Sequence, residues 1–165
     1  MTTTLTRGLT ACFAILITLI GTLVAATPAS STSAVPVASL TNIRTGLNSG
    51  FDRIVLDLTD GPRPDVSHTW VDELIQDPTG EIFWLTGEHF LNVVSTPARA
   101  FDDNYTKTYL GPEKFRTRNL RNVMAVGLTG DFEAHLSIGI GTRYQSWVRV
   151  FVLTAPHRIV IDVGS

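Results

Sequence analysis

The sequence predicts an all-β fold, a sandwich of two antiparallel sheets with pseudo-symmetric halves. Short runs of β-branched and aromatic residues recur along the chain and are separated by glycine and proline. No long stretch shows the period of an amphipathic helix. Arg53–Leu58 is repeated, residue type by residue type, as Arg158–Val163. One structural element is therefore used twice, near each end of a single domain.

The first half of the domain contains four candidate strands. Residues 53–58 form the first, because apolar side chains at every second position share one face. A run of turn formers at 60–65 ends it, and a less regular alternation at 66–74 predicts the next strand. Two short apolar runs, at 81–85 and 90–94, predict a strand pair.

The second half ends in a predicted β-hairpin. Residues 123–128 are expected to form a strand, and the strict alternation at 134–140 predicts a strand with one face buried and one exposed. Residues 147–153 and 158–163 are rich in β-branched and aromatic side chains. Pro156 separates them, and proline cannot donate a ladder hydrogen bond, so the chain is expected to turn there.

The N-terminus has the features of a signal peptide. Residues 1–26 contain a short start, an apolar run and the small residues Val24-Ala25-Ala26, which offer a cleavage site. We expect export with cleavage, then a flexible Ser/Thr/Ala/Pro linker at 27–40 and the folded domain at 41–165. A retained membrane anchor is the alternative, for which the apolar run is short.

Cysteine usage and charge narrow the possible functions. Cys12, the single cysteine, lies in the N-terminal segment, so a processed chain would have no disulfide or thiolate chemistry. The residues before it match a bare lipobox, but the apolar run follows the cysteine, so we do not expect lipidation. The chain has 13 Lys and Arg, including Arg7 in the N-terminal segment, against 15 Asp and Glu. This balance argues against nucleic-acid binding.

Three segments in order carry a resemblance to a known family: Gly50–Val55, Gly130–Glu133 and Arg149–Val163. Together they resemble the AMIN-like domain of secreted actinobacterial proteins, which is related to the AMIN domain of periplasmic amidases and secretins. The resemblance covers about residues 43–163 and implies a β-sandwich of two similar halves. It also implies a role at the cell envelope, where some members position enzymes or secretion machinery and peptidoglycan is the ligand usually proposed.

The repeated arginines and aspartates are the first candidate functional residues: Arg53, Asp57, Arg158 and Asp162. Within each copy, Arg and Asp lie on the same face of the strand. If the two strands are antiparallel neighbours, each Arg can form an ion pair with the Asp of the other copy, which would fix the strand register. The alternative is that Arg53 and Arg158 bind a carboxylate or the hydroxyls of a wall polymer.

The irregular segment 96–122 is the second candidate, because a long loop in a compact domain is often functional. It combines aromatic and basic side chains, a composition suited to sugars or an anionic polymer. The residues expected to contact such a ligand are Tyr105, Tyr109, Arg116 and Arg118. A mobile loop with solvated charges is equally compatible with the composition. Trp70, Trp84 and Trp147 are expected to pack in the core.

Catalysis has little support in the sequence. Asp131 and Glu133 could form a carboxylate pair of the kind that hydrolyses glycosides, but no other residue supplies a positioned base or nucleophile. The four histidines show no metal-binding spacing. We therefore expect no enzyme activity, metal or cofactor.

The expected function is that of a secreted, non-catalytic domain associated with the cell envelope. It would recognise peptidoglycan or another wall glycan, without nucleic acid and without stable insertion in a membrane after cleavage. The first alternative is a protein interaction module that docks a secreted partner by strand addition. A wall hydrolase that uses Asp131 and Glu133 is the third possibility.

Overall fold

A computed structural model describes residues 37–165 of the chain. The expected signal peptide, Cys12 and the linker up to residue 36 lie outside these residues. The described part contains ten strands and no helix: β1 Ala38–Asn48, β2 Phe51–Leu58, β3 Asp65–Val71, β4 His89–Thr96, β5 Ala98–Arg99, β6 Lys114–Arg116, β7 Val123–Phe132, β8 His135–Thr142, β9 Val148–Thr154 and β10 His157–Gly164. No segment of it could cross a membrane as a helix.

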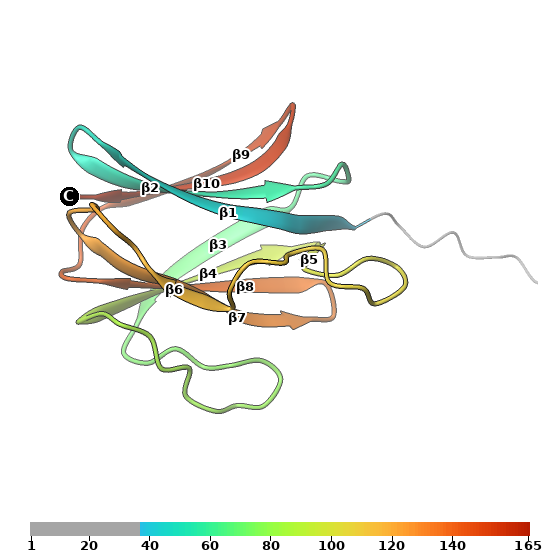
Figure 1. Cartoon of the computed structure of the whole chain (residues 1–165), viewed down its shortest axis with the longest axis horizontal. Coiled ribbons are helices and arrows are strands. Elements are labelled where there is room, and N and C mark those ends of the chain that lie inside the picture. The colour runs from blue at the N-terminus through green and yellow to red at the C-terminus, as the bar shows by residue number, and fades with distance from the viewer. Residues whose placement is uncertain (1–36) are drawn as a thin grey trace, which may run out of the picture. The chain divides into compact units, whose positions relative to one another are not determined.

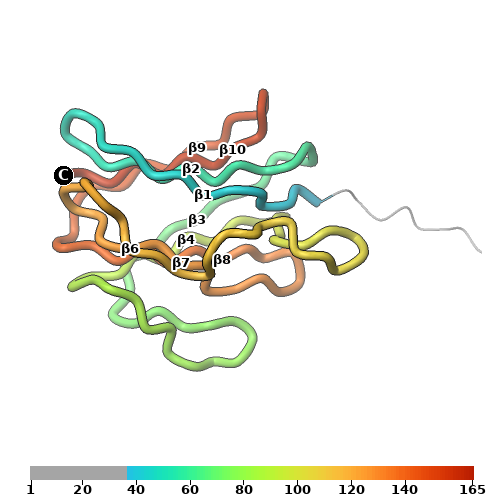
Figure 2. Tube along the Cα trace, viewed as in Figure 1, coloured from blue at the N-terminus to red at the C-terminus, as the bar shows by residue number. Residues whose placement is uncertain are grey.

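The strands form two five-stranded sheets, which confirms the predicted all-β fold. The first sheet has the order β5-β1-β2-β10-β9, and the second has the order β3-β4-β8-β7-β6. The sheets make two layers (Figure 1), and the chain passes between them through the connections traced in Figure 2. All strand pairs are antiparallel except the short pairing of β1 with β5.

The core lies between the two sheets and follows from alternation along the strands. Ile54 and Leu56 of β2, and Ile159 and Ile161 of β10, are completely buried. They pack against residues such as Ile138 of β8 in one hydrophobic cluster. Burying one such side chain contributes about 1.5–3 kcal/mol, so the cluster accounts for the association of the sheets.

The two copies of the repeated element are neighbours in the first sheet. β10 pairs with β2 antiparallel, and the register places Asp162 opposite Arg53 and Arg158 opposite Asp57. Val55 and Val160 face each other midway between these pairs. The antiparallel arrangement on which the predicted ion pairs depend is therefore present.

The buried Asp52 fixes the start of β7 to β2. Its carboxylate accepts hydrogen bonds from the backbone N–H groups of Asn122 at 2.7 Å and of Val123 at 2.9 Å. The Asn122 side chain donates in turn to the carbonyl oxygen of Gly164, at 2.8 Å. This network joins the two sheets at one end because each group would otherwise be buried without a partner.

The domain begins three residues earlier than the sequence indicates. Ala38, Ser39 and Leu40, which the composition assigns to the end of the linker, are buried residues of β1. The cause is tertiary: these residues pair with β5 and, at Leu40, with β2, and the composition of the segment does not reveal these contacts.

The prediction of one exposed face for residues 134–140 is wrong, because β8 is buried on both faces. Segment 72–88, which connects β3 with β4, covers the outer side of the second sheet (Figure 1). Leu74 packs on Gly139, and Phe83 packs on Gly127 of the neighbouring strand β7. The glycines leave space in which the segment approaches the sheet backbone closely.

Residues 81–85 belong to this covering segment and do not form the predicted strand. Their β-type contact is an isolated bridge between Ile75 and Ile82, whereas β4 pairs with β3 and β8. Phe83 is buried against the sheet and Trp84 points outward with 75% of its surface exposed. The apolar run at 81–85 therefore packs on a sheet and does not form one of its strands.

A tight turn separates β7 from β8 at Glu133 and Ala134, where the alternation predicts a strand. Both residues have positive φ angles, 49° and 60°, as a two-residue hairpin turn requires. Asn and Gly are the usual residues at such positions, so Glu-Ala gives no turn signal. The carbonyl oxygen of Ala134 accepts a hydrogen bond from the backbone N–H of Ala98 at 2.9 Å.

Candidate ligand-binding site

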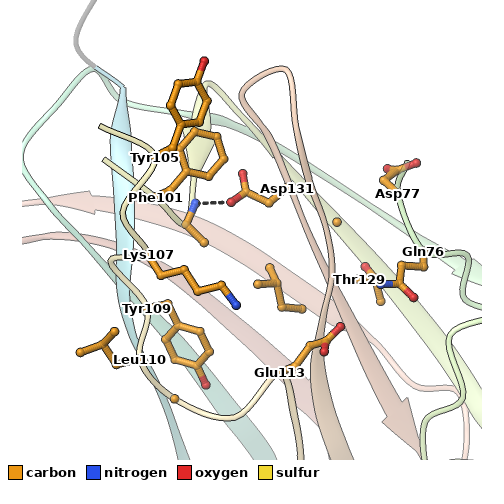
Figure 3. A pocket seen from close by; sticks show the side chains of 14 residues that line it. Gln76, Asp77, Phe101, Tyr105, Lys107, Tyr109, Leu110, Glu113, Thr129 and Asp131 are labelled. Carbon is orange, nitrogen blue, oxygen red and sulfur yellow. Dashed lines mark hydrogen bonds between the residues drawn. The ribbon is translucent and has the colours of Figure 1, made fainter. Parts of the chain in front are cut away.

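A pocket of about 570 Å³ opens beside β7. Its walls come from the chain between β5 and β6, from the C-terminal half of β7 and from the turn at Gln76 and Asp77 (Figure 3). The volume is in the range typical of small-ligand sites. Its lining side chains include Phe101, Tyr105, Lys107, Tyr109, Glu113 and Asp131.

Aromatic rings form one wall of the pocket. Tyr105 is 83% exposed and stacks on Phe101, with ring centroids 5.4 Å apart. Tyr109 is buried, its hydroxyl donates to the carbonyl oxygen of Pro112 at 3.1 Å, and burial raises the pKa of its phenol. Tyr105 thus presents a free ring at the mouth, while Tyr109 is a fixed part of the wall.

Asp131 provides a partly free acceptor. Its Oδ2 accepts a hydrogen bond from the backbone N–H of Ala100 at 2.8 Å (Figure 3). Its Oδ1 is buried and has no hydrogen-bond partner in the described part of the chain. Burial raises the pKa of Asp131, an effect that the Ala100 hydrogen bond and the charge of Arg99 partly oppose. A ligand hydroxyl donating to Oδ1 would satisfy this atom.

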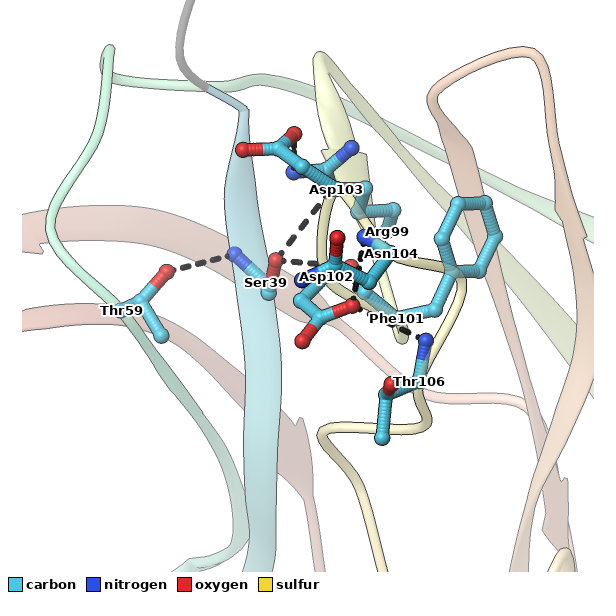
Figure 4. A network of polar contacts seen from close by, with 8 residues as sticks. All are labelled: Ser39, Thr59, Arg99, Phe101, Asp102, Asp103, Asn104 and Thr106. Carbon is cyan, nitrogen blue, oxygen red and sulfur yellow. Dashed lines mark hydrogen bonds and ion pairs between the residues drawn. The ribbon is translucent and has the colours of Figure 1, made fainter.

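A polar network holds the loop that carries Tyr105 (Figure 4). The Ser39 hydroxyl donates to the carbonyl oxygen of Phe101 at 3.0 Å, and the backbone N–H of Ser39 donates to the Thr59 hydroxyl at 2.8 Å. Asp102 accepts hydrogen bonds from the backbone N–H groups of Asn104 and Thr106, at 2.8 and 2.9 Å. The aromatic wall is therefore anchored to β1.

A second concentration of polar side chains lies on the outer surface of the first sheet, around Asp162. Arg53 donates from Nε to Oδ1 at 2.6 Å and from Nη2 to Oδ2 at 2.9 Å, and Arg149 donates from Nη2 to Oδ2 at 2.6 Å. Burial alone would raise the pKa of Asp162, but these hydrogen bonds outweigh it and hold the pKa below its ordinary value. Asp162 is fully buried beneath the two guanidinium groups.

The other half of the predicted cross pair does not form. Asp57 is bound by Arg44 through two hydrogen bonds of 2.7 Å, which lower its pKa. Arg158 donates instead to the carbonyl oxygen of Pro156 at 3.4 Å. Arg44 lies on β1, which pairs with the other edge of β2, so it competes for the carboxylate from the side away from β10. Arg53 and Asp162 are the one predicted pair that the structure contains.

The sequence profile of the AMIN-like domain matches residues 38–165. The chain belongs to the AMIN-like domain family. This family is associated with binding, and the matched range coincides with the start of β1. No curated protein and no solved structure shows a significant match to the chain.

The predicted ligand residues lie in separate places on the AMIN-like domain. Tyr105 and Tyr109 line the pocket, whereas Arg53 lies on the outer surface of the first sheet. Arg116 donates to the Thr86 hydroxyl at 3.1 Å and borders a shallow pocket of about 200 Å³. Arg118 and Arg158 line neither pocket. The composition of segment 96–122 therefore indicated two residues of the pocket, Tyr105 and Tyr109, together with two arginines that lie outside it.

The AMIN-like domain also contains site residues that sequence reasoning missed. Glu113 and Asp77 line the pocket. Glu113 lies in segment 96–122, where only aromatic and basic residues were singled out, and Asp77 lies in segment 72–88 and belongs to no motif. Trp147 and Trp84 were expected in the core, but their exposed fractions are 53% and 75%. The prediction of burial is therefore wrong for these two, whereas Trp70 packs against the core.

Asp131 and Glu133 occupy different environments in the AMIN-like domain. Asp131 lines the pocket, while Glu133 is exposed in the turn after β7 and is not a lining residue. Within residues 37–165 no three His, Cys, Asp or Glu side chains are grouped as metal ligands would be.

Proposed function

We propose that this protein is an exported, non-catalytic binding domain that holds a cell-wall glycan, such as a peptidoglycan strand, in the pocket beside β7. The observation that carries the proposal is the combination of an exposed tyrosine ring with a buried carboxylate oxygen that has no partner among the described residues. The N-terminal sequence, with its signal-peptide features, supports export.

The chemistry of the pocket suits a sugar. The C–H face of a sugar ring is apolar and packs on an aromatic ring such as that of Tyr105, while its hydroxyls need acceptors. Asp131, Asp77 and Glu113 supply carboxylates around the same space. Lys107 adds a donor for the ring oxygens and acetamido carbonyls of a wall glycan.

Tyr105→Ala should weaken binding to purified insoluble peptidoglycan by about fivefold, because a stacked aromatic contact contributes on the order of 1 kcal/mol. The thermal midpoint should stay near that of the wild type, since the ring is largely outside the core. The measurement is a co-sedimentation isotherm with the full-length protein in low and high salt, with an unrelated β-sandwich as the control for nonspecific binding.

Tyr144→Ala is the matched control, because Tyr144 is also exposed and is not among the residues that line the pocket. Equal losses in the two variants, or no more binding by the wild type than by the unrelated β-sandwich, would contradict the proposal. So would release of soluble fragments by the wild type that Glu133→Gln or Asp131→Asn abolishes, since that result would identify a hydrolase.

One observation favours a second function, docking of a secreted protein partner. β9 is the last strand of the first sheet, and in the described chain it pairs with β10 alone. An edge strand with free backbone groups can accept a further strand. Crosslinking from Leu153, which is exposed on β9, would then capture a specific partner and not wall material.

A further inference from the structure

We propose that the outer surface of the first sheet is a second binding site, which takes a carboxylate-bearing polysaccharide through two guanidinium groups and three aromatic rings. The site, called the arginine face below, consists of Arg53, Arg149, Phe51, Phe151 and Trp147. It shares no residue with the pocket beside β7, so the inference goes beyond the proposed function and is independent of it.

Strand register assembles the arginine face from three strands. Asp162 of β10 lies opposite Arg53 of β2 and opposite Arg149 of β9. The Arg53 guanidinium lies 5.1 Å from the ring centroid of Phe51 and 5.8 Å from that of Phe151, and Arg149 lies 5.3 Å from Phe151. The rings and Asp162 thus hold both guanidinium groups in place before any ligand arrives.

The charge of this surface is positive. Arg53 and Arg149 share one carboxylate, so the cluster retains a positive charge, whereas Arg44 and Asp57 neutralise each other nearby. The whole chain, by contrast, has a formal net charge of −2. A positive patch on a negative protein selects an anionic partner.

Arg149 has hydrogen-bonding capacity that the fold does not use. Arg53 binds both carboxylate oxygens of Asp162 and so joins β2 to β10 without a contribution from Arg149. The Arg149 side chain is 60% exposed and donates to Asp162 through Nη2 alone within the described residues. Its remaining N–H groups form a fork of the shape that binds a carboxylate through two hydrogen bonds.

The aromatic rings indicate that the carboxylate is attached to a sugar. Trp147 is 53% exposed and packs beside Phe51, with centroids 6.1 Å apart and planes tilted by 54°. Phe51 in turn lies under the Arg53 guanidinium, so the exposed indole extends a flat apolar surface from the anion site. A sugar ring that carries a carboxylate fits both parts, which is why we commit to an acidic polysaccharide.

The test is titration calorimetry of the full-length protein with polygalacturonate, a polymer with one carboxylate on each sugar. Arg149→Gln should weaken binding by about tenfold, because a charge-assisted hydrogen bond is lost. Arg118→Gln removes the same charge from an exposed residue outside the arginine face, and it should leave the affinity within about twofold. Neutral dextran should not bind this site.

Two further variants keep the proposal testable if Arg149→Gln affects folding. Trp147→Ala leaves every guanidinium in place and should weaken polygalacturonate binding by about fivefold. Tyr105→Ala changes the pocket beside β7 and should leave this affinity unchanged, which separates the second site from the first. Thermal midpoints of all variants identify any that are unfolded.

Several results would overturn the inference. They are equal losses for Arg149→Gln and Arg118→Gln, similar affinity for dextran and polygalacturonate, and a loss for Tyr105→Ala as large as that for Trp147→Ala. Tighter binding of polyphosphate than of polygalacturonate would also overturn it, because the site would then select phosphate and not a sugar carboxylate.

Discussion

Gly141→Ala should lower the free energy of unfolding by about 3 kcal/mol, because a methyl group at this position overpacks a closed interface. A Cβ atom on Gly141 would overlap the carbonyl oxygen of Thr86 and would lie 3.3 Å from the Cα atom of Gly87. Both are backbone atoms, so no side chain can rotate away and segment 72–88 must move off β8. Urea denaturation at neutral pH measures the loss.

Gly46→Ala is the matched control. It makes the same substitution in strand β1, where a Cβ atom has no neighbour within 4 Å, and stability should change by less than about 1 kcal/mol. Equal effects in the two variants would show that loss of glycine itself matters, and that segment 72–88 does not pack closely on β8.

Asp162→Asn should lower the free energy of unfolding by about 2–3 kcal/mol at neutral pH, because it leaves two guanidinium groups beside a neutral amide. Asp162 has no exposed surface and is the single carboxylate that Arg53 and Arg149 bind. The substitution preserves shape, but it removes the charge and replaces one acceptor oxygen with an NH2 donor. Urea denaturation of the two proteins side by side is the measurement.

The control for this variant is Asp103→Asn, which breaks the ion pair between Asp103 and Arg99. The Asp103 side chain is 83% exposed, and an ion pair with so exposed a partner contributes less than about 1 kcal/mol. A loss for Asp162→Asn no larger than that for Asp103→Asn would mean that the Asp162 cluster does not stabilise the sheet.

The stability difference between wild type and Asp162→Asn should depend on pH. The pKa of Asp162 in the folded protein lies below its ordinary value. The carboxylate therefore stabilises the fold fully above the unfolded pKa of about 3.9, and this contribution is lost as pH falls through the folded pKa. The difference should be largest near neutral pH and should shrink below about pH 4. A difference that grows on acidification would contradict the assigned ion pairs.

The ion pairing between the repeated strands was predictable for strands that are antiparallel neighbours, because it depends on residues within each copy. Arg and Asp four positions apart in both copies project from the same face, and antiparallel pairing then brings opposite charges together. The structure confirms this for Arg53 and Asp162. It does not do so for Asp57, because the competing Arg44 belongs to a third strand whose position the repeat does not encode.

The candidate sites were only partly predictable because their parts are distant in the sequence. Tyr105 is a candidate ring for ligands and Asp131 a candidate acid by residue type, but nothing in the sequence places them in one pocket. Trp147 reads as a core residue by type. The strand order leaves it on the outer surface of the first sheet, beside Phe51.

The sequence by itself determined the all-β class, the terminal hairpin and the inward face of β2, because alternation of apolar residues reports burial of one face directly. Only the tertiary structure decided whether the opposite face is also covered. On β8 it is covered, because segment 72–88 packs on a surface of glycines, and that contact depends on strand order and close backbone approach. The pocket and the arginine face likewise arise from tertiary contacts, which bring together segments that are distant in the chain.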